Sequence, residues 1–168
     1  GSDCFGYDDA FSRDHDWGPD FCMWVTEDTY KQIGPKLQEA YEQLPKEYKG
    51  FQRNVTPQGV GRRGVRTIED FYGKLLGFTV VGTAPGEDET AKSSLSYAEK
   101  ILKQLDWTAV PDYALAAAVN GEVFRDDQGI FTAIREKLLE GYPEHILYRK
   151  LAEVCAKFAQ AAQYNYSR

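Results

Sequence analysis

Phe21-Cys22-Met23-Trp24-Val25 is an uninterrupted apolar run with polar residues on both sides. A short apolar run without alternation is typical of a strand that is buried on both faces, in a sheet that helices cover. We expect this strand to begin near Asp14. The run therefore predicts an α/β fold that contains a buried strand near its start.

A helix and a second strand are expected after this run. Thr26 or Asp28 can cap a helix over roughly 28–44, because apolar residues recur there at three- and four-residue steps. These residues are Tyr30, Ile33, Leu37, Tyr41 and Leu44. The stretch 52–64 has the composition of a loop, and Val65-Arg66-Thr67-Ile68 predicts a second strand.

The second half of the chain is expected to be helical. A short helix over 69–76 ends at Gly77, and residues 82–94, rich in Gly, Pro and acids, predict a linker. We therefore divide the chain into an α/β core, 1–81, and a helical region, 90–168. Apolar periodicity predicts helices over 96–105, 111–119, 130–140 and 144–163.

Composition limits the class of protein. The 168 residues are 42% apolar and 14% aromatic, which is enough to bury a core. No apolar run approaches 18 residues and no signal-peptide pattern is present, so we expect no membrane association and a cytoplasmic location. Three widely spaced cysteines without a CxxC pair predict neither a disulfide framework nor a zinc site.

The negative charge is concentrated near the start of the chain. Residues 1–28 contain eight carboxylates and one base, Arg13, whereas the other 140 residues contain 18 acids and 19 bases. Crowded carboxylates repel one another, and a bound cation offsets that repulsion; a solvated acidic loop is the alternative interpretation. The acidic isoelectric point, about 5.0, argues against a long nucleic-acid groove.

Asp14 and Asp16 are the carboxylates whose spacing carries chemistry. Alternate residues of a strand point to the same face, so this pair can share one or two Mg²⁺ or Mn²⁺ ions. Such cations prefer oxygen ligands, and they activate an attacking hydroxyl while stabilising a leaving pyrophosphate. Gly1 and Ser2 add a hydroxyl and a backbone N–H that can approach phosphates without obstruction.

The spacing of Gly1-Ser2, eleven residues and then Asp14-His15-Asp16 resembles the motif of the DNA polymerase beta-like nucleotidyltransferase superfamily. The longer string Ser12-Arg13-Asp14-His15-Asp16-Trp17-Gly18-Pro19 is similar to an uncharacterised, mainly bacterial branch of that superfamily. Gly121-Glu122-Val123-Phe124-Arg125-Asp126-Asp127 and Tyr142-Pro143 are similar to the same branch. The resemblance implies a polymerase beta-like mixed-sheet core followed by a helical region.

The resemblance also implies an activity: transfer of a nucleoside monophosphate, AMP, from a triphosphate such as ATP to a small-molecule, protein or RNA-end acceptor. Asp14 and Asp16 would hold the metal, and Gly1 and Ser2 would contact the β- and γ-phosphates. Arg13 would offset phosphate charge.

Two departures from the family pattern matter. Members place an apolar strand before the Gly-Ser turn, so we expect this core to lack its first strand. Active members also carry a third carboxylate on a later strand. Here the nearest candidates are Glu69 and Asp70, just beyond the expected strand, where a helix cap is the other interpretation.

These departures leave a second class of function open. A catalytically degenerate fold of this kind would bind nucleotide or a protein partner, for example as an antitoxin-like partner of a helical RNase. The loop Gly59 to Gly64, with Arg62 and Arg63, can clasp a phosphate or form a flexible hairpin loop. Motifs of hydrolases, zinc proteases and P-loop NTPases are absent from the sequence.

Overall fold

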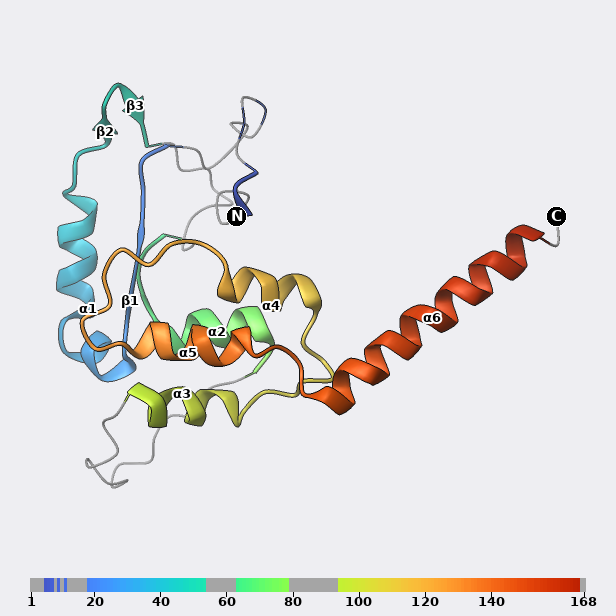
Figure 1. The fold of residues 1–168 in the computed structure, drawn as a ribbon. Coiled ribbons are helices and arrows are strands. Elements are labelled where there is room, and N and C mark those ends of the chain that lie inside the picture. The colour runs from blue at the N-terminus through green and yellow to red at the C-terminus, as the bar shows by residue number, and fades with distance from the viewer. Residues whose placement is uncertain are drawn as a thin grey trace.

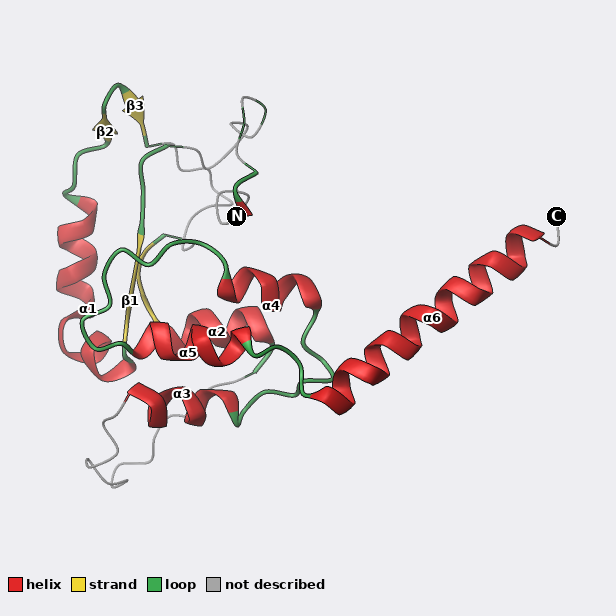
Figure 2. Ribbon diagram, viewed as in Figure 1, coloured by secondary structure: helices red, strands yellow, loops and turns green. Residues whose placement is uncertain are grey.

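The computed structural model of the protein describes residues 5–7, 9, 11, 18–53, 63–78 and 94–166. Two small sheets with their helices are followed by a mainly helical region, which confirms the mixed α/β class (Figure 1, Figure 2). The elements are β1 (Cys22–Val25), α1 (Glu27–Glu42), β2 (Glu47–Tyr48), β3 (Phe51–Gln52), β4 (Gly64–Thr67), α2 (Ile68–Leu76), α3 (Ser94–Leu102), α4 (Asp112–Val119), α5 (Ile130–Leu139) and α6 (Glu144–Tyr166).

The first sheet is a parallel pair, β1 with β4, in which Cys22 lies opposite Gly64 and Val25 opposite Thr67. β4 confirms the second expected strand to within one residue. The expectation of a long, fully buried first strand is wrong for the described residues. β1 begins only at Cys22, because Gly18 has a φ of +125° and Pro19 has no N–H for a sheet ladder.

β1 is half-buried along its whole length, and Phe21 just before it is 47% exposed. In the described part of the chain β1 pairs with β4 alone, so no further strand shields its other edge. The other edge of β4 is partly closed by α1, because the Val65 N–H donates to Gln38 Oε1 at 3.0 Å. An apolar run therefore did not guarantee burial on both faces.

β2 and β3 form a hairpin that the sequence did not predict. Their register pairs Tyr48 with Phe51, which leaves Lys49 and Gly50 as the two loop residues. Both have positive φ angles, 52° and 81°, as a type I′ turn requires. Lys-Gly is a weaker hairpin signal than Asn-Gly, and strands of two residues are too short to show alternation.

α1 and α2 each start directly after a strand, and each is capped by a threonine. Thr26 Oγ1 accepts from the Thr29 N–H at the start of α1, and Thr67 Oγ1 accepts from the Asp70 N–H at the start of α2. α2 ends at Gly77, whose φ of +82° is the left-handed conformation expected at a helix end. The bounds expected for both helices are confirmed to within two residues.

The four helices expected after residue 90 are confirmed as α3 to α6, with bounds that differ by no more than three residues. Gly129 precedes α5 and Gly141 follows it, both with positive φ, and Pro143 precedes α6. None of the helices in the described ranges combines the length and the apolarity that crossing a bilayer requires.

The core is one cluster in which α2 lies among α3, α4 and α5 (Figure 1). It therefore draws residues from both sides of the linker expected at 82–94, and the division into two domains stays a prediction. The buried residues of this cluster are Ile68, Tyr72, Leu76, Ala98, Ile101, Val110, Leu115, Ala118, Phe131, Ala133, Ile134 and Leu138.

An aromatic cluster attaches β1 to this core. The Trp24 ring stacks on Phe131 of α5, with centroids 4.6 Å apart and an interplanar angle of 17°. Phe71 lies 4.8 Å from Trp24, and the fully buried Tyr72 lies 5.3 Å from Phe131. Offset aromatic contacts of this kind add about 0.5–1.5 kcal/mol each beyond the area that they bury.

Ile134→Ala tests the helical core. Ile134 is completely buried, so the cavity left by the shorter side chain should lower the free energy of unfolding by about 2–5 kcal/mol. Leu139→Ala in the same helix, at a side chain that is 64% exposed, is the control and should cost about 0.5 kcal/mol or less. Urea titration followed by circular dichroism measures both, and equal losses would contradict this core.

Candidate functional site at the two ends of the β1–β4 pair

The parallel pairing of β1 and β4 gives this sheet two chemically different ends. At the end named the entry edge both strands begin, and Cys22 lies opposite Gly64. At the end named the exit edge both strands finish, and Val25 lies opposite Thr67. Polar side chains gather at each edge. The entry edge continues toward the Asp14-His15-Asp16 motif in the sequence, and the exit edge contains Glu69 and Asp70.

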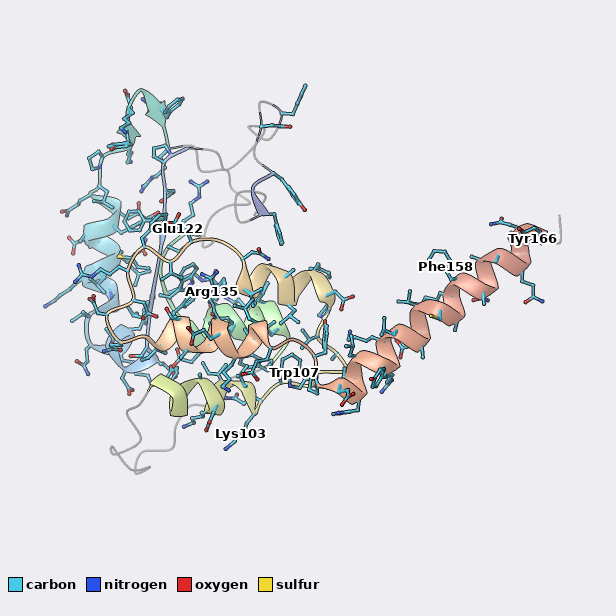
Figure 3. The ribbon with its side chains drawn as sticks, viewed as in Figure 1. Lys103, Trp107, Glu122, Arg135, Phe158 and Tyr166 are labelled. Atoms are coloured by element: carbon cyan, nitrogen blue, oxygen red, sulfur yellow. The ribbon has the colours of Figure 1, made fainter. Side chains whose placement is uncertain are left out.

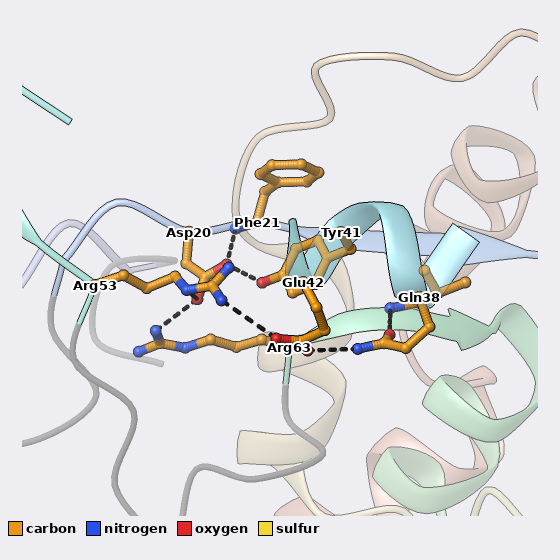
Figure 4. A network of polar contacts seen from close by, with 8 residues as sticks. Asp20, Phe21, Gln38, Tyr41, Glu42, Arg53 and Arg63 are labelled. Atoms are coloured by element: carbon orange, nitrogen blue, oxygen red, sulfur yellow. Dashed lines mark hydrogen bonds and ion pairs between the residues drawn. The ribbon is translucent and has the colours of Figure 1, made fainter. Parts of the chain in front are cut away.

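A buried ion cluster occupies the entry edge (Figure 4). Arg63 Nη1 donates to Asp20 Oδ2 at 2.7 Å, and Arg53 Nε lies 3.9 Å from the same oxygen. Asp20 Oδ1 accepts from the Tyr41 hydroxyl and, at 2.9 Å, from the Phe21 N–H. The side chains of Asp20 and Arg53 are 9% and 8% exposed. One carboxylate thus joins the segment before β1 to α1, to the residue after β3 and to the residue before β4.

The cluster strengthens the preference of the Tyr41 hydroxyl for its protonated form. Burial raises the pKa of the Tyr41 hydroxyl above its usual range, and the hydrogen bond to Asp20 and the charge of that carboxylate raise it further. Arg53 lies over the Tyr41 ring, 5.1 Å from its centroid, and also pairs with Glu42 at 3.5 Å. Removing one member of a buried pair leaves a charge without compensation, which typically costs about 3–5 kcal/mol.

Gly18 is held tightly beside this cluster. A Cβ atom built on Gly18 would overlap the carbonyl oxygen of Gln52 and approach Arg53 Cα to 3.1 Å. Only glycine tolerates both this contact and a φ of +125°. The chain is therefore fixed against β3 two residues after the Asp-x-Asp motif ends in the sequence.

Five of the predicted site residues lie outside the described residues. These are Gly1, Ser2, Arg13, Asp14 and Asp16. The phosphate-binding role considered for Arg63 stays a prediction, and its guanidinium is bonded to Asp20. Sequence reasoning missed Asp20 and Arg53 as partners, because nothing local to either residue indicates a contact across more than 30 positions.

A pocket of about 320 Å³ lies at the exit edge. It is lined by Glu27, Thr67, Glu69, Asp70, Gly73, Lys74 and Phe78. The Glu69 side chain is buried, and its Oε1 accepts from the Tyr97 hydroxyl and, at 3.3 Å, from the Glu27 N–H. Glu69 does not cap its own helix, since Thr67 caps α2, and its side chain instead accepts a hydrogen bond from the first residue of α1.

Asp70 is already neutralised by two cations. Its Oδ2 lies 2.6 Å from Arg66 Nη2, and its Oδ1 lies 2.7 Å from Lys74 Nζ. Burial acts to raise the pKa of Asp70, but hydrogen bonds from Lys74 and Arg66, with their charges, outweigh it and hold the pKa below its usual value. Among the described residues, no group of three His, Cys, Asp or Glu side chains is arranged to bind a metal ion.

The C-terminal part of the chain carries a separate set of contacts. The Tyr142 hydroxyl bonds to the Val110 carbonyl at 2.9 Å, and Lys150 Nζ donates to the same carbonyl at 3.0 Å. Beyond this anchor α6 extends away from the body, and Phe158 and Tyr166 are 76% and 93% exposed (Figure 3). The two bonds to the Val110 carbonyl attach the start of α6 to the segment just before α4.

A comparison with protein families finds a similarity in this C-terminal part. Residues 107–168 match a family described as a domain of unknown function, DUF4037. The matched segment contains α4, α5 and α6, and it includes Gly121 to Asp127 and Tyr142-Pro143, whereas Ser12 to Pro19 lies outside it. No curated protein and no solved structure matches the chain significantly.

Gly18→Ala tests how tightly the segment before β1 is held. Positive φ alone costs a non-glycine residue about 1–2 kcal/mol, and at Gly18 the overlap with Gln52 is added. Gly50→Ala is the matched control, since Gly50 also has positive φ but a Cβ there meets nothing within 4 Å. We expect the larger loss of unfolding free energy for Gly18→Ala in urea titrations; equal losses would mean that this contact does not form.

Asp70→Asn tests the ion pairs at the exit edge. Because the folded-state pKa is lowered, the stabilisation is present above the unfolded value of about 3.9 and disappears as the pH falls through the folded value. We expect a loss of at most about 1 kcal/mol at pH 7, since the side chain is 36% exposed.

The difference in stability between the variant and the parent protein should shrink as the pH falls below about 4, and it should vanish once the pH is below the folded-state pKa of Asp70. Asp28→Asn, at an exposed carboxylate in the first turn of α1, is the control for the effect of a helix start. Unfolding free energies measured from pH 2 to pH 7 decide this; a difference between Asp70→Asn and parent that does not change with pH would contradict it.

Proposed function

We propose that this chain is a Mg²⁺-dependent nucleotidyltransferase that moves a nucleoside monophosphate, AMP, from ATP to an acceptor. Asp14 and Asp16 hold the metal, Gly1 and Ser2 contact the β- and γ-phosphates, and Arg13 offsets phosphate charge. The acceptor is a small molecule, a protein or an RNA end. The metal supplies charge stabilisation of the leaving pyrophosphate when it is bound.

The observation that carries the proposal is the Gly-Ser, Asp-x-Asp spacing directly before a chain segment that is anchored by a buried ion cluster. Catalytic carboxylates must be positioned to within about 0.5 Å, which requires a rigid support. Gly18 and Asp20 follow Asp16 by two and four residues in the sequence. Gly18 is packed against Gln52, and Asp20 is paired with Arg63, the residue before β4. These contacts support the segment that follows the motif. The mixed α/β architecture agrees with the proposal.

A second candidate is a nucleotide- or protein-binding module that has a nucleotidyltransferase fold without catalysis, for example an antitoxin-like partner. The observation that favours it concerns the third carboxylate. Asp70 pairs with both Arg66 and Lys74, and Glu69 is bonded to Tyr97 and to the start of α1. Both side chains therefore have structural partners that compete with a metal role.

Thermal unfolding with each ribonucleoside triphosphate, with and without Mg²⁺, tests the proposal. A ligand at 100 times its dissociation constant adds about 2.7 kcal/mol of stability, so ATP with Mg²⁺ should raise the midpoint clearly. The Asp14→Asn, Asp16→Asn double variant should lose this shift. The Asp8→Asn, Asp9→Asn double variant removes the same charge from the same acidic segment and should keep it.

Pyrophosphate release then separates the two candidates. Release that depends on Mg²⁺ and on Asp14 and Asp16 supports the transferase. A nucleotide-dependent shift without release, across a panel of acceptors, supports the binding module. No shift with any nucleotide in folded protein would overturn both nucleotide roles and leave protein partners.

A further inference from the structure

Glu69 is a buried carboxylate whose hydrogen bonding is incomplete. Its side chain lines the pocket at the exit edge, and the residue is only 9% exposed. Oε1 has two donors, the Tyr97 hydroxyl and the Glu27 N–H, but Oε2 is buried and has no hydrogen-bond partner. A buried carboxylate oxygen without a donor is costly, so a donor supplied by a ligand would stabilise it.

Glu69 differs from the other two carboxylates of the pocket in its partners. Asp70 is balanced by Arg66 and Lys74, and Glu27 lies 3.3 Å from Lys31. Glu69 differs from both, because its donors are neutral and no cation of the described residues pairs with it. A buried carboxylate is normally paired with a positive charge. The pairing therefore favours a ligand that brings a positive charge directly to Glu69.

The remaining walls fit an organic cation better than a metal ion. Phe78 offers an aromatic ring that suits a hydrocarbon group or a cation lying over its face. Thr67 and Gly73 are small and neutral. The described residues provide no three-ligand metal group here. A volume of about 320 Å³ is at the small end of ligand pockets. The carboxyl ends of parallel strands are also the usual place for ligands in α/β sheets.

We propose that this pocket binds a small organic molecule with one ammonium or guanidinium group, whose nitrogen donates to Glu69 while its apolar part lies against Phe78. This assignment does not rest on the nucleotide proposal, because it involves neither Asp14 nor Asp16 and requires no metal or triphosphate. It gives Glu69 an organic cation as its partner in place of the third-carboxylate role.

Titration with benzylamine and with benzyl alcohol tests the site in the unaltered protein. The two probes have the same ring and almost the same size, but only the amine is positively charged at pH 7. Backbone amide signals of Thr67, Gly73 and Phe78 are followed by NMR in the absence of nucleotide and Mg²⁺. We expect benzylamine to shift these signals and to bind at least about tenfold more tightly than benzyl alcohol.

Glu69→Gln keeps the shape of the side chain and removes its charge, and it should weaken benzylamine binding about tenfold or more. Glu153→Gln, at an exposed carboxylate of α6, is the control and should leave binding unchanged. Equal affinities for amine and alcohol, undiminished binding to folded Glu69→Gln, or shifts confined to residues outside the pocket would overturn the proposal. The amine–alcohol comparison decides the matter even if Glu69→Gln does not fold.

Discussion

The stacking of Trp24 on Phe131 is the contact on which the rest of the structure depends. A pair of four-residue strands cannot be stable by itself in water, since independent sheets need more strands or a helical layer. The Trp24 ring, with Phe71 and Tyr72 beside it, gives β1 that layer by attaching it to α2 and α5. Both edges of the sheet, and thus both candidate sites, are positioned relative to this aromatic cluster.

The carboxylates at the two edges differ in how completely they are paired. At the entry edge one buried carboxylate, Asp20, is surrounded by two guanidiniums and a tyrosine hydroxyl, so its charge is used to hold chain segments together. At the exit edge Asp70 is balanced in the same way, but Glu69 retains an oxygen without a donor. Electrostatics therefore gives the entry edge a structural role as a support and gives the exit edge the capacity to take a ligand.

Much of the fold could be predicted because its signals are local. Helix periodicity, a threonine before α1 and Gly77 after α2 act within one or two turns, so the helix bounds followed from the sequence to within three residues. The burial of β1 and the β2–β3 hairpin could not be predicted in this way. Burial depends on which strands and helices become neighbours, and the hairpin depends on Lys49 accepting a positive φ.

The sequence by itself determined the mixed α/β class, the helices and the Asp-x-Asp spacing, because each is written in residues that are close together along the chain. Only the tertiary structure decided that Asp20 pairs with Arg63, 43 positions away, and that Glu69 meets both Tyr97 and the start of α1. A carboxylate looks the same in sequence whether it is solvated, paired or buried without a donor. Its chemistry is set by the charges and donors that folding brings to within about 3 Å of it.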